Sequence, residues 1–185
     1  RPGKKEKIFT MYKFRTMSNK KDKDGNLLPD ELRLTKLGKF LRKTSLDEIP
    51  EFINILKGDM SFVGPRPQLI KDMVFMSNEV RKRHNVSPGL TGLAQINGRN
   101  SIDWDNKFKY DLEYINNITF KTDLIIVIKT FLLFFKKNEN GTNGTELAPD
   151  YGDYLLINGR IDRNMYDKVI KKYEENYTKD KKKYR

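Results

Sequence analysis

Residues 45–67, SLDEIPEFINILKGDMSFVGPRP, decide how the middle of this chain must fold. From Ile49 to Leu56 apolar residues recur at i, i+3, i+4 and i+7, which is the spacing of one face of an α-helix. Gly58 follows the last of them, and glycine is suited to ending a helix because it adopts the left-handed conformation readily. The prolines of residues 64–67 exclude a continued helix. The stretch therefore predicts a short amphipathic helix followed by a stiff turn.

The start of this helix has two possible readings. Ser45 and Glu48 have the spacing of a capping box. With Ser45 as the N-cap, however, Pro50 would be the fifth helical residue and would remove an intrahelical hydrogen bond. With Asp47 as the N-cap, Pro50 falls in the first turn, where proline is tolerated. We therefore predict a helix that begins at Asp47.

A helix starting there would place the carboxylates of Asp47 and Glu48 at its positive end, which favours their ionised forms. An ionised aspartate is a competent nucleophile toward phosphorus, and carboxylates are also the ligands that Mg²⁺ prefers. A purely structural role in helix capping is the alternative for this pair.

Two segments before this stretch are also expected to be ordered. Residues 8–17 are rich in strand formers, and period-2 alternation would put Lys13 and Arg15 on one face of a strand, about 7 Å apart. Residues 30–43 predict a basic helix.

The segments after it are mostly helical. We expect helices over residues 68–84, 104–117, 123–137 and 165–177, and an ordered loop with at most a short strand over residues 87–100. Residues 123–137 are almost continuously apolar, but as a helix they cover only about 20 Å, which is too short to span a bilayer. They form either a buried core helix or one lying in a membrane interface. The predicted fold class is α+β, predominantly helical with a small β-hairpin or sheet.

Composition excludes several kinds of site. A chain of 185 residues fits one domain, and the absence of cysteine excludes disulfides, thiolate metal sites and cysteine nucleophiles. His84 is the only histidine, so no histidine-rich metal site can form. The chemistry must come from carboxylates, hydroxyls and cations.

The net charge of +12 is concentrated at the two ends of the chain. Residues 1–43 hold 14 Lys+Arg against 5 Asp+Glu, and residues 161–185 hold 9 against 5. Such segments attract nucleic acid, an anionic membrane surface or phosphorylated small molecules. A nucleic-acid-binding module is one alternative, but no recognised motif of such a module is present, so we expect no nucleic acid as partner.

Cations flank the two carboxylates on both sides in the sequence. They are Lys13, Arg15 and Arg42 before them and Arg66, between two prolines, after them. Arginine binds phosphate through a planar fork of donors. Carboxylates combined with several cations are typical of phosphoryl transfer, in which a metal ion and arginines offset the charge of the transferred group. A metal-dependent phosphohydrolase is a second alternative.

Four motifs carry a resemblance to a known family. They are Tyr-Lys-Phe-Arg-Thr-Met at 12–17, Ser-Leu-Asp-Glu at 45–48, Lys-Gly-Asp-Met-Ser-Phe-Val-Gly-Pro-Arg-Pro at 57–67, and Pro-Gly-Leu-Thr-Gly at 88–92 continuing to Asn-Gly-Arg at 97–99. In this order they resemble the monotopic phosphoglycosyl transferases, a family of bacterial sugar transferases that start the assembly of surface glycans and glycoconjugates. The resemblance runs from Arg1 to about Phe135.

The resemblance implies a fold, a domain division and a location. It implies a monotopic membrane-associated catalytic domain, with residues 1–137 as the catalytic core and residues 138–185 as a linker and C-terminal amphipathic helix. Family members carry an N-terminal apolar re-entrant helix, which this sequence lacks before Arg1, so we expect that the membrane anchor has been removed or lies on a portion outside this sequence. The implied location is the cytoplasmic face of the bacterial inner membrane, with basic residues 1–43 facing anionic lipid.

It also implies a reaction. Asp47 would attack the β-phosphate of a UDP-sugar, expel UMP and form a covalent sugar-phosphate adduct. Polyprenyl (undecaprenyl) phosphate would then accept the phosphosugar. Mg²⁺ is the implied cofactor with Asp47 as its ligand, and Glu48 is the second catalytic carboxylate.

The remaining implied site residues bind or shape the substrate. Lys13, Thr16, Arg42 and Arg66 would hold phosphates, Gln95, Asn97 and Arg99 would contact the nucleotide or shape its loop, and Asp111 lies on a further family motif.

Overall fold

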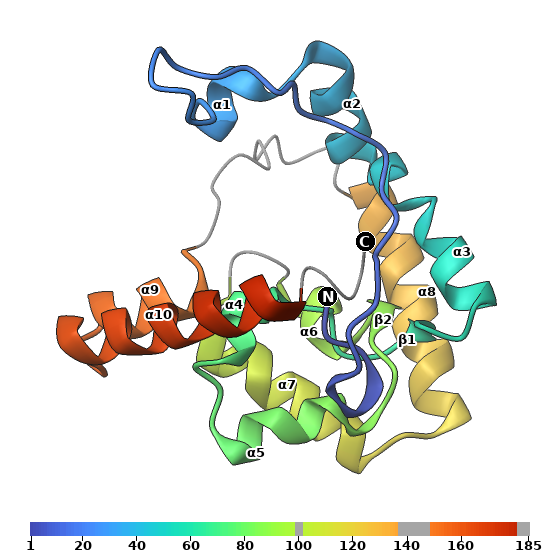
Figure 1. Cartoon of the computed structure of the whole chain (residues 1–185). Coiled ribbons are helices and arrows are strands. Elements are labelled where there is room, and N and C mark those ends of the chain that lie inside the picture. Colours follow the sequence, from blue (N-terminus) through green and yellow to red (C-terminus); the bar gives the residue numbers. More distant parts are fainter. Residues whose placement is uncertain (99–101, 137–148, 181–185) are drawn as a thin grey trace.

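The computed structural model describes residues 1–98, 102–136 and 149–180 (Figure 1). Its α-helices are α1 (Asp30–Arg33), α2 (Lys36–Thr44), α3 (Glu51–Leu56), α4 (Ile70–Met73), α5 (Asn78–Arg81), α6 (Leu93–Ile96), α7 (Trp104–Asn116), α8 (Phe120–Lys136), α9 (Tyr151–Ile157) and α10 (Arg163–Asp180). Three 3₁₀ turns are η1 (Lys4–Glu6), η2 (Leu46–Glu48) and η3 (Lys82–Asn85). The strands are β1 (Ser61–Val63) and β2 (Gly89–Thr91). The prediction of a mainly helical α+β fold is confirmed.

The two strands pair in parallel, so the predicted alternative of a hairpin is wrong. Ser61 lies opposite Gly89, and Val63 lies opposite Thr91. A parallel pair requires a crossover connection, which α4, α5 and η3 supply here. Gly64, directly after β1, packs against the segment before β2 because it has no side chain: a Cβ on Gly64 would lie 2.5 Å from the carbonyl oxygen of Ser87.

The largest hydrophobic cluster lies where α7 and α9 meet the region after α4. Its buried members are Met76, Trp104, Phe108, Tyr151 and Leu155. The aromatic rings pack with centroids 4.9 Å apart for Phe108 and Tyr151 and 5.4 Å apart for Trp104 and Phe108, at angles typical of aromatic pairs. Helix α9, which follows the predicted catalytic core, therefore contributes to the same hydrophobic core as α7.

A second cluster joins β1 to α7 and α8 through Val63, Tyr114 and Ile126. Helix α8 confirms the predicted helix over residues 123–137, but it is not a buried core helix. Ile126 is 1% exposed, whereas apolar residues around it, including Leu124, Ile128 and Phe131, are exposed. The sequence allowed either a buried core helix or a helix in a membrane interface; within the described residues, the buried core helix is wrong.

The segment of residues 8–17 is extended, but it is not the predicted strand. Its backbone is held by isolated hydrogen bonds rather than by a neighbouring strand. The buried side chain of Asn54 accepts from the backbone N–H of Tyr12 (3.0 Å) and donates to the carbonyl of Thr10 (2.7 Å). Further on, the N–H of Phe14 donates to the carbonyl of Asp47. A side-chain amide thus replaces the ladder partner that alternation alone had suggested.

Two of the predicted helices are broken. The segment 30–43 divides into α1 and α2 because the Thr35 side chain caps a new helix by accepting from the N–H of Gly38 (2.9 Å). The segment 68–84 divides into α4, α5 and η3. There the guanidinium of Arg81 donates to the carbonyls of Met73 and Met76, so these carbonyls are satisfied without a continuous helix.

The remaining predictions of helices are closer to the structure. Helix α7 confirms the prediction over residues 104–117, and α10 includes the predicted 165–177. The loop of residues 87–100 contains the short strand β2, and α6 was not predicted.

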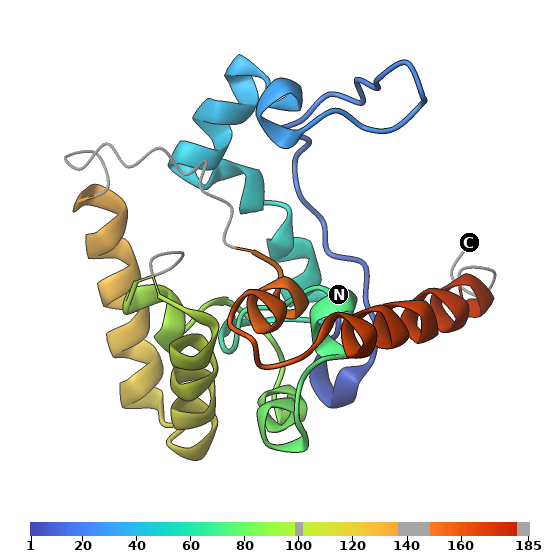
Figure 2. The same ribbon diagram turned by 90° about the vertical axis from the view of Figure 1, so that its left-hand side faces the viewer.

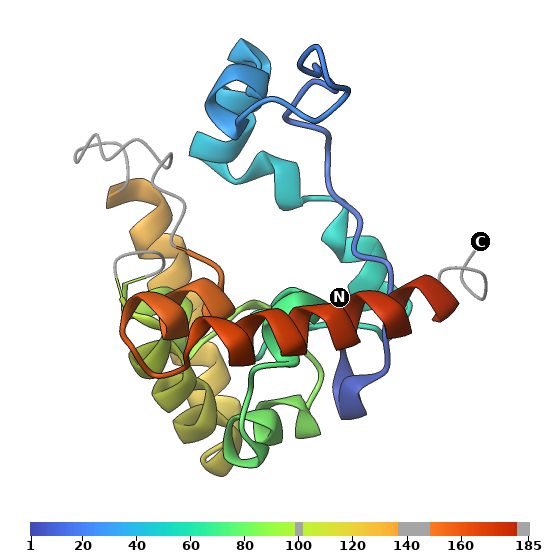
Figure 3. The ribbon, with the colours of Figure 1, turned by 60° about the vertical axis from the view of Figure 1, so that its left-hand side comes forward.

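In two further views α1 and α2 stand away from the body formed by α4 to α10 (Figures 2 and 3). Within the described residues, no helix combines the length and the apolar character needed to cross a membrane. The extended segment before α1, and η2 with α3 after α2, connect this projecting part to the body.

Gly38 decides how closely α2 approaches the extended segment. A Cβ there would collide with the carbonyl group of Thr16. Alanine is favoured over glycine inside a helix by about 1 kcal/mol, so helix propensity predicts that Gly38→Ala stabilises the protein, whereas packing predicts that it destabilises it. We expect Gly38→Ala to destabilise the protein by roughly 2 kcal/mol, because the obstacle is backbone. Urea unfolding measures this, with the exposed Lys39→Ala as the control. A stabilised Gly38→Ala variant would mean that the Thr16 segment moves aside at little cost.

Candidate active site

The predicted carboxylates lie in η2, between α2 and α3, and the local geometry corrects the expected helix start. Helix α2 ends at Thr44, and Ser45 directly after it has a left-handed φ of 55°. Helix α3 begins only at Glu51, with Pro50 in front of it, and neither Ser45 nor Pro50 makes a side-chain capping bond. Asp47 is therefore not an N-cap. The reason is that proline, which lacks an N–H, fits before the first helical turn better than inside it.

Glu48 is bound by cations from two distant segments. Its Oε1 accepts from Lys13 Nζ at 2.8 Å and from Arg66 Nη2 at 2.6 Å. Burial alone would raise the pKa of Glu48, but Arg66 and Lys13 outweigh it and lower the pKa to about 2. Glu48 is thus a fixed anion whose position is set by both cations.

Glu51 is a further carboxylate of this cluster, and the sequence analysis missed it. It is 1% exposed, and its Oε1 lies 3.0 Å from Lys13 Nζ. Burial raises the pKa of Glu51, and the neighbouring Glu48 adds to this, while Lys13 opposes it. The signal in the sequence is its place three residues after Glu48, which puts both carboxylates on one side of a helical turn.

Asp47 differs from its neighbours because no other described residue forms a hydrogen bond or ion pair with its carboxylate, whose only hydrogen bond among the described residues comes from the backbone N–H of Asp47 itself. Burial raises the pKa of Asp47 and the charge of Glu48 raises it further, whereas Lys13 and Arg42 act in the opposite direction. The expectation that a helix end would favour the ionised form is therefore wrong for Asp47, whereas the ionised form of Glu48 is favoured by Arg66 and Lys13. Desolvation and a like charge dominate instead.

Arg42 and Thr16 are also brought together. Arg42 Nε donates to Thr16 Oγ1 at 3.1 Å, which joins α2 to the extended segment. Arg15, expected on the same face as Lys13, has an exposed side chain. Lys13 and Arg66 thus contact Glu48 from two separate segments, while Arg42 lowers the pKa of Asp47 through its charge and is itself hydrogen-bonded to Thr16.

The turn that carries Arg66 is anchored at its backbone. The N–H of Gly89 donates to the carbonyl of Pro65 at 3.0 Å, and Arg83 Nη2 donates to the carbonyl of Arg66 at 2.7 Å. The Arg66 side chain is 42% exposed, so its guanidinium reaches Glu48 while part of it faces solvent. Arg83 was not among the predicted site residues. It lies near Arg66 because of the crossover between the two strands, and no local sequence pattern indicates this.

The other predicted site residues lie outside this cluster. Gln95 and Asn97 belong to α6 and its end. Both polar atoms of the Gln95 amide are buried without a hydrogen-bond partner among the described residues, and Asn97 Nδ2 donates to the carbonyl of Leu93. Arg99 lies outside the described residues. Asp111 is 3% exposed and pairs with Arg83, so its predicted contact with substrate stays a prediction.

The donor set at Asp47 fits a magnesium ion that is shared with a phosphate. Mg²⁺ in phosphoryl-transfer sites is commonly held by one or two carboxylates, waters and substrate oxygens rather than by a cage of protein ligands. The Asp47 carboxylate has no competing partner among the described residues, while Glu48 is occupied by cations. Within the described parts of the chain, no three His, Cys, Asp or Glu residues are grouped to hold a metal ion.

The arrangement has the features of a site that handles phosphate. It offers one carboxylate with no partner among the described residues, a second carboxylate fixed by Lys13 and Arg66, and an arginine–threonine pair next to them. Guanidinium and ammonium groups bind phosphate oxygens, and a carboxylate without an ion-pair partner can attack phosphorus or bind a cation.

Comparison with known proteins agrees with this chemistry. The family model described as bacterial sugar transferase matches residues 1–137. An uncharacterized sugar transferase of Bacillus subtilis is 53% identical over 130 residues, which are 70% of this chain and 64% of that protein. An undecaprenyl-phosphate galactose phosphotransferase of Salmonella typhimurium is 36% identical over 156 residues, covering 75% of this chain and 33% of that protein.

A UDP-glucose:undecaprenyl-phosphate glucose-1-phosphate transferase of Klebsiella pneumoniae is 42% identical over 146 residues, which are 74% of this chain and 31% of that protein. The chain thus spans between about a third and two thirds of the length of these relatives. Because the family model covers most of the chain, the chain belongs to the bacterial sugar transferase family.

Proposed function

We propose that this protein is a phosphoglycosyl transferase that moves a sugar phosphate from a UDP-sugar to polyprenyl phosphate. Relatives in its family are named as undecaprenyl-phosphate phosphotransferases for galactose, glucose and N-acetylgalactosamine. The observation that carries the proposal is the Asp47 carboxylate, which no described residue binds although the adjacent Glu48 is held by two cations.

The proposed reaction has two displacements at the β-phosphorus of the donor. An oxygen of ionised Asp47 attacks this phosphorus. The bond between the β-phosphorus and the oxygen that bridges the two phosphates then breaks. UMP leaves with that oxygen and its electron pair, and the sugar phosphate stays on Asp47 as an acyl phosphate. An oxygen of polyprenyl phosphate then attacks the same phosphorus. The Asp47 carboxylate is released, and polyprenyl-diphosphate-sugar is the product.

The neighbouring residues offset the charge of the transferred group. Arg66 presents a planar fork of donors from a stiff turn, and Lys13 adds a second cation on the same side of Glu48. Arg42 and Thr16, which are hydrogen-bonded to each other, would bind a phosphate next to Asp47. Glu48 orients Lys13 and Arg66. Mg²⁺ held by Asp47 would supply further positive charge to the diphosphate.

Gln95, Asn97 and Arg99 are proposed to face or shape the nucleotide site. The buried amide of Gln95 supports this for one of them, because its donor and acceptor have no partner among the described residues. A buried amide gains most from a ligand that satisfies both groups.

We further propose that the protein works on a membrane, at the cytoplasmic face of the bacterial inner membrane, as the polyprenyl acceptor requires. Leu56 of α3 is 88% exposed and Phe131 of α8 is 67% exposed, and the rest of the exposed surface of α8 is also rich in apolar side chains. Such surfaces are typical of helices lying in a membrane interface. The basic residues 1–43 add attraction to anionic lipid.

The products test this function. The protein is mixed with UDP-glucose, UDP-galactose or UDP-N-acetylgalactosamine, Mg²⁺ and vesicles carrying polyprenyl phosphate. We expect one donor to give UMP and lipid-linked diphosphate sugar in equal amounts, and about one UMP per protein when the lipid acceptor is omitted. Release of UDP would indicate a glycosyl transferase. Free sugar phosphate formed continuously without acceptor would indicate a phosphohydrolase, and either result would overturn the proposal.

A further inference from the structure

We propose that Arg83 and Asp111 form a positioning pair that holds Arg66 in its working orientation, an inference that rests on the proposed function. Among the described residues, neither side chain forms a hydrogen bond or ion pair with Asp47 or Glu48. Both act through the backbone of the turn that carries Arg66.

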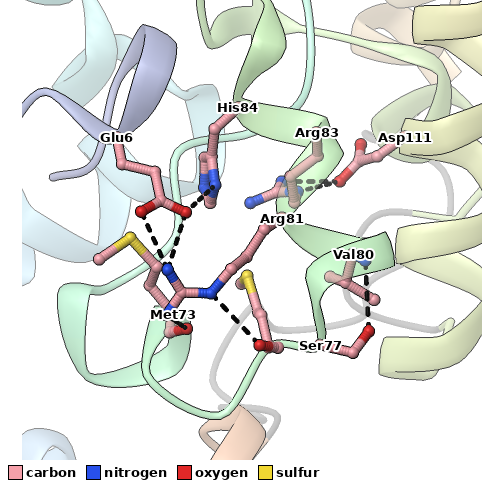
Figure 4. Close-up of polar contacts among 9 residues, drawn as sticks. Glu6, Met73, Ser77, Val80, Arg81, Arg83, His84 and Asp111 are labelled. Atoms are coloured by element: carbon pink, nitrogen blue, oxygen red, sulfur yellow. Dashed lines mark hydrogen bonds and ion pairs between the residues drawn. The ribbon is translucent and has the colours of Figure 1, made fainter.

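The pair is enclosed in the protein. The side chains of Arg83 and Asp111 are 1% and 3% exposed, and Figure 4 shows the Arg83 guanidinium facing the Asp111 carboxylate. Arg83 Nε and Nη2 both approach Asp111 Oδ2, at 2.8 and 2.6 Å, and the guanidinium lies 5.6 Å from the centre of the Phe108 ring. Helix α7 supplies Asp111 and Phe108, so one helix fixes the plane of the guanidinium from two sides.

Within the described residues, that guanidinium forms one further hydrogen bond, which joins it to the active site. Arg83 Nη2 donates to the carbonyl of Arg66 at 2.7 Å. Because Pro65 and Pro67 restrict the backbone on either side, holding this carbonyl orients the whole turn. The Arg66 side chain then extends to Glu48 Oε1 at 2.6 Å. The contacts form a chain from α7 through η3 and the turn to η2.

Stability alone is a weak explanation for such a pair. Removing an arginine and an aspartate from water is unfavourable, and apolar residues of similar volume often serve a protein core equally well. A buried arginine nevertheless provides what apolar residues lack, namely a rigid donor that can be aimed at one carbonyl oxygen. The carbonyl that Arg83 binds is that of Arg66, whose side chain binds Glu48.

The chain contains a matched control in Arg81. This residue also lies next to an acid and also donates to backbone carbonyls. Its Nη1 binds Glu6, and its other nitrogens donate to Met73 and Met76 (Figure 4). It therefore makes the same kinds of contact as Arg83, two residues away, in a more exposed place and without a contact to Arg66. A lysine at either position keeps the charge but loses the fork geometry.

The test is a double-mutant cycle on transfer from the UDP-sugar identified above. We expect Arg83→Lys to lower kcat/KM at least about tenfold in the otherwise unchanged protein, but less than about twofold in the Arg66→Ala background, because its effect passes through Arg66. Asp111→Asn should follow the same pattern. Arg81→Lys should change kcat/KM less than about twofold in both backgrounds. Thermal unfolding of every variant checks that it is folded.

Two results would overturn the proposal. The first is an equal fold-loss from Arg83→Lys with and without Arg66. The second is an equal loss from Arg81→Lys, which would indicate a general weakening of the fold. If the unchanged protein releases no UMP from any donor, the proposed function fails, and the positioning role is then decided by ¹⁵N relaxation of the Arg66 amide. Its mobility should rise in Arg83→Lys and not in Arg81→Lys; an unchanged Arg66 would overturn the pair independently of activity.

Discussion

Asp47→Asn is expected to abolish sugar-phosphate transfer, with a loss of roughly 10⁴-fold or more in kcat, the scale on which removal of a nucleophile acts. Asparagine has nearly the same shape but lacks the charge and the second oxygen needed to attack phosphorus. Because no described residue binds the Asp47 carboxylate, the substitution breaks no ion pair and should leave the fold intact. Turnover of the donor sugar and thermal unfolding together measure these two expectations.

The covalent step gives this prediction a second readout. Intact mass of the unchanged protein, mixed with donor and Mg²⁺ but no lipid, should rise by one sugar phosphate. The increase should be absent in Asp47→Asn. Asp24→Asn, in the exposed loop before α1, is the matched control and should keep both the adduct and the activity. An adduct of normal yield on Asp47→Asn would assign the nucleophile to another residue.

The second large effect is expected at Arg66. Arg66→Ala removes the donor that approaches Glu48 at 2.6 Å and that we assign to the transferred phosphate. The loss of one aligned charge-stabilising donor lowers kcat by about 10² to 10³-fold in comparable sites. The kcat of Arg66→Lys should lie between those of the unchanged protein and Arg66→Ala, because a lysine keeps the charge without the planar fork. Steady-state kinetics with the donor sugar measures both variants.

The fold should tolerate these substitutions because the Arg66 side chain is 42% exposed. Arg163→Ala on α10, which removes an exposed arginine paired with Asp167, is the control and should leave transfer unchanged. Activity of Arg66→Ala within about threefold of the unchanged protein would remove Arg66 from the site. The same result would also remove the reason for a pair that positions it.

Much of the site could be predicted because its residues lie in short motifs. The Pro-Arg-Pro turn, the two adjacent carboxylates and the basic segments before them are visible without any tertiary information. Their partners are not. Lys13 and Glu48 are 35 residues apart in the chain, and Arg83 and Arg66 are 17 apart. Whether such residues meet depends on the packing of the segments between them.

Several errors have the same origin. Alternation in residues 8–17 suggested a strand, but the buried Asn54 supplies the partner for its backbone. The helix expected from Asp47 begins at Glu51, since the left-handed Ser45 and the following Pro50 set the chain direction. The apolar run of α8 indicated a helix correctly but did not tell which of its faces would be covered.

The sequence by itself determined the helical character of the chain, the end of α3 at the Gly58 region, the stiff turn around Arg66 and the bacterial sugar transferase family. These depend on interactions between residues a few positions apart, which a local pattern records. Only the tertiary structure decided that the strands are parallel, that Glu48 is bound while Asp47 has no partner among the described residues, and that Arg83 supports Arg66. The physical reason is that an ion pair or a buried hydrogen bond depends on distance and desolvation, and both are set by how segments distant in sequence pack together.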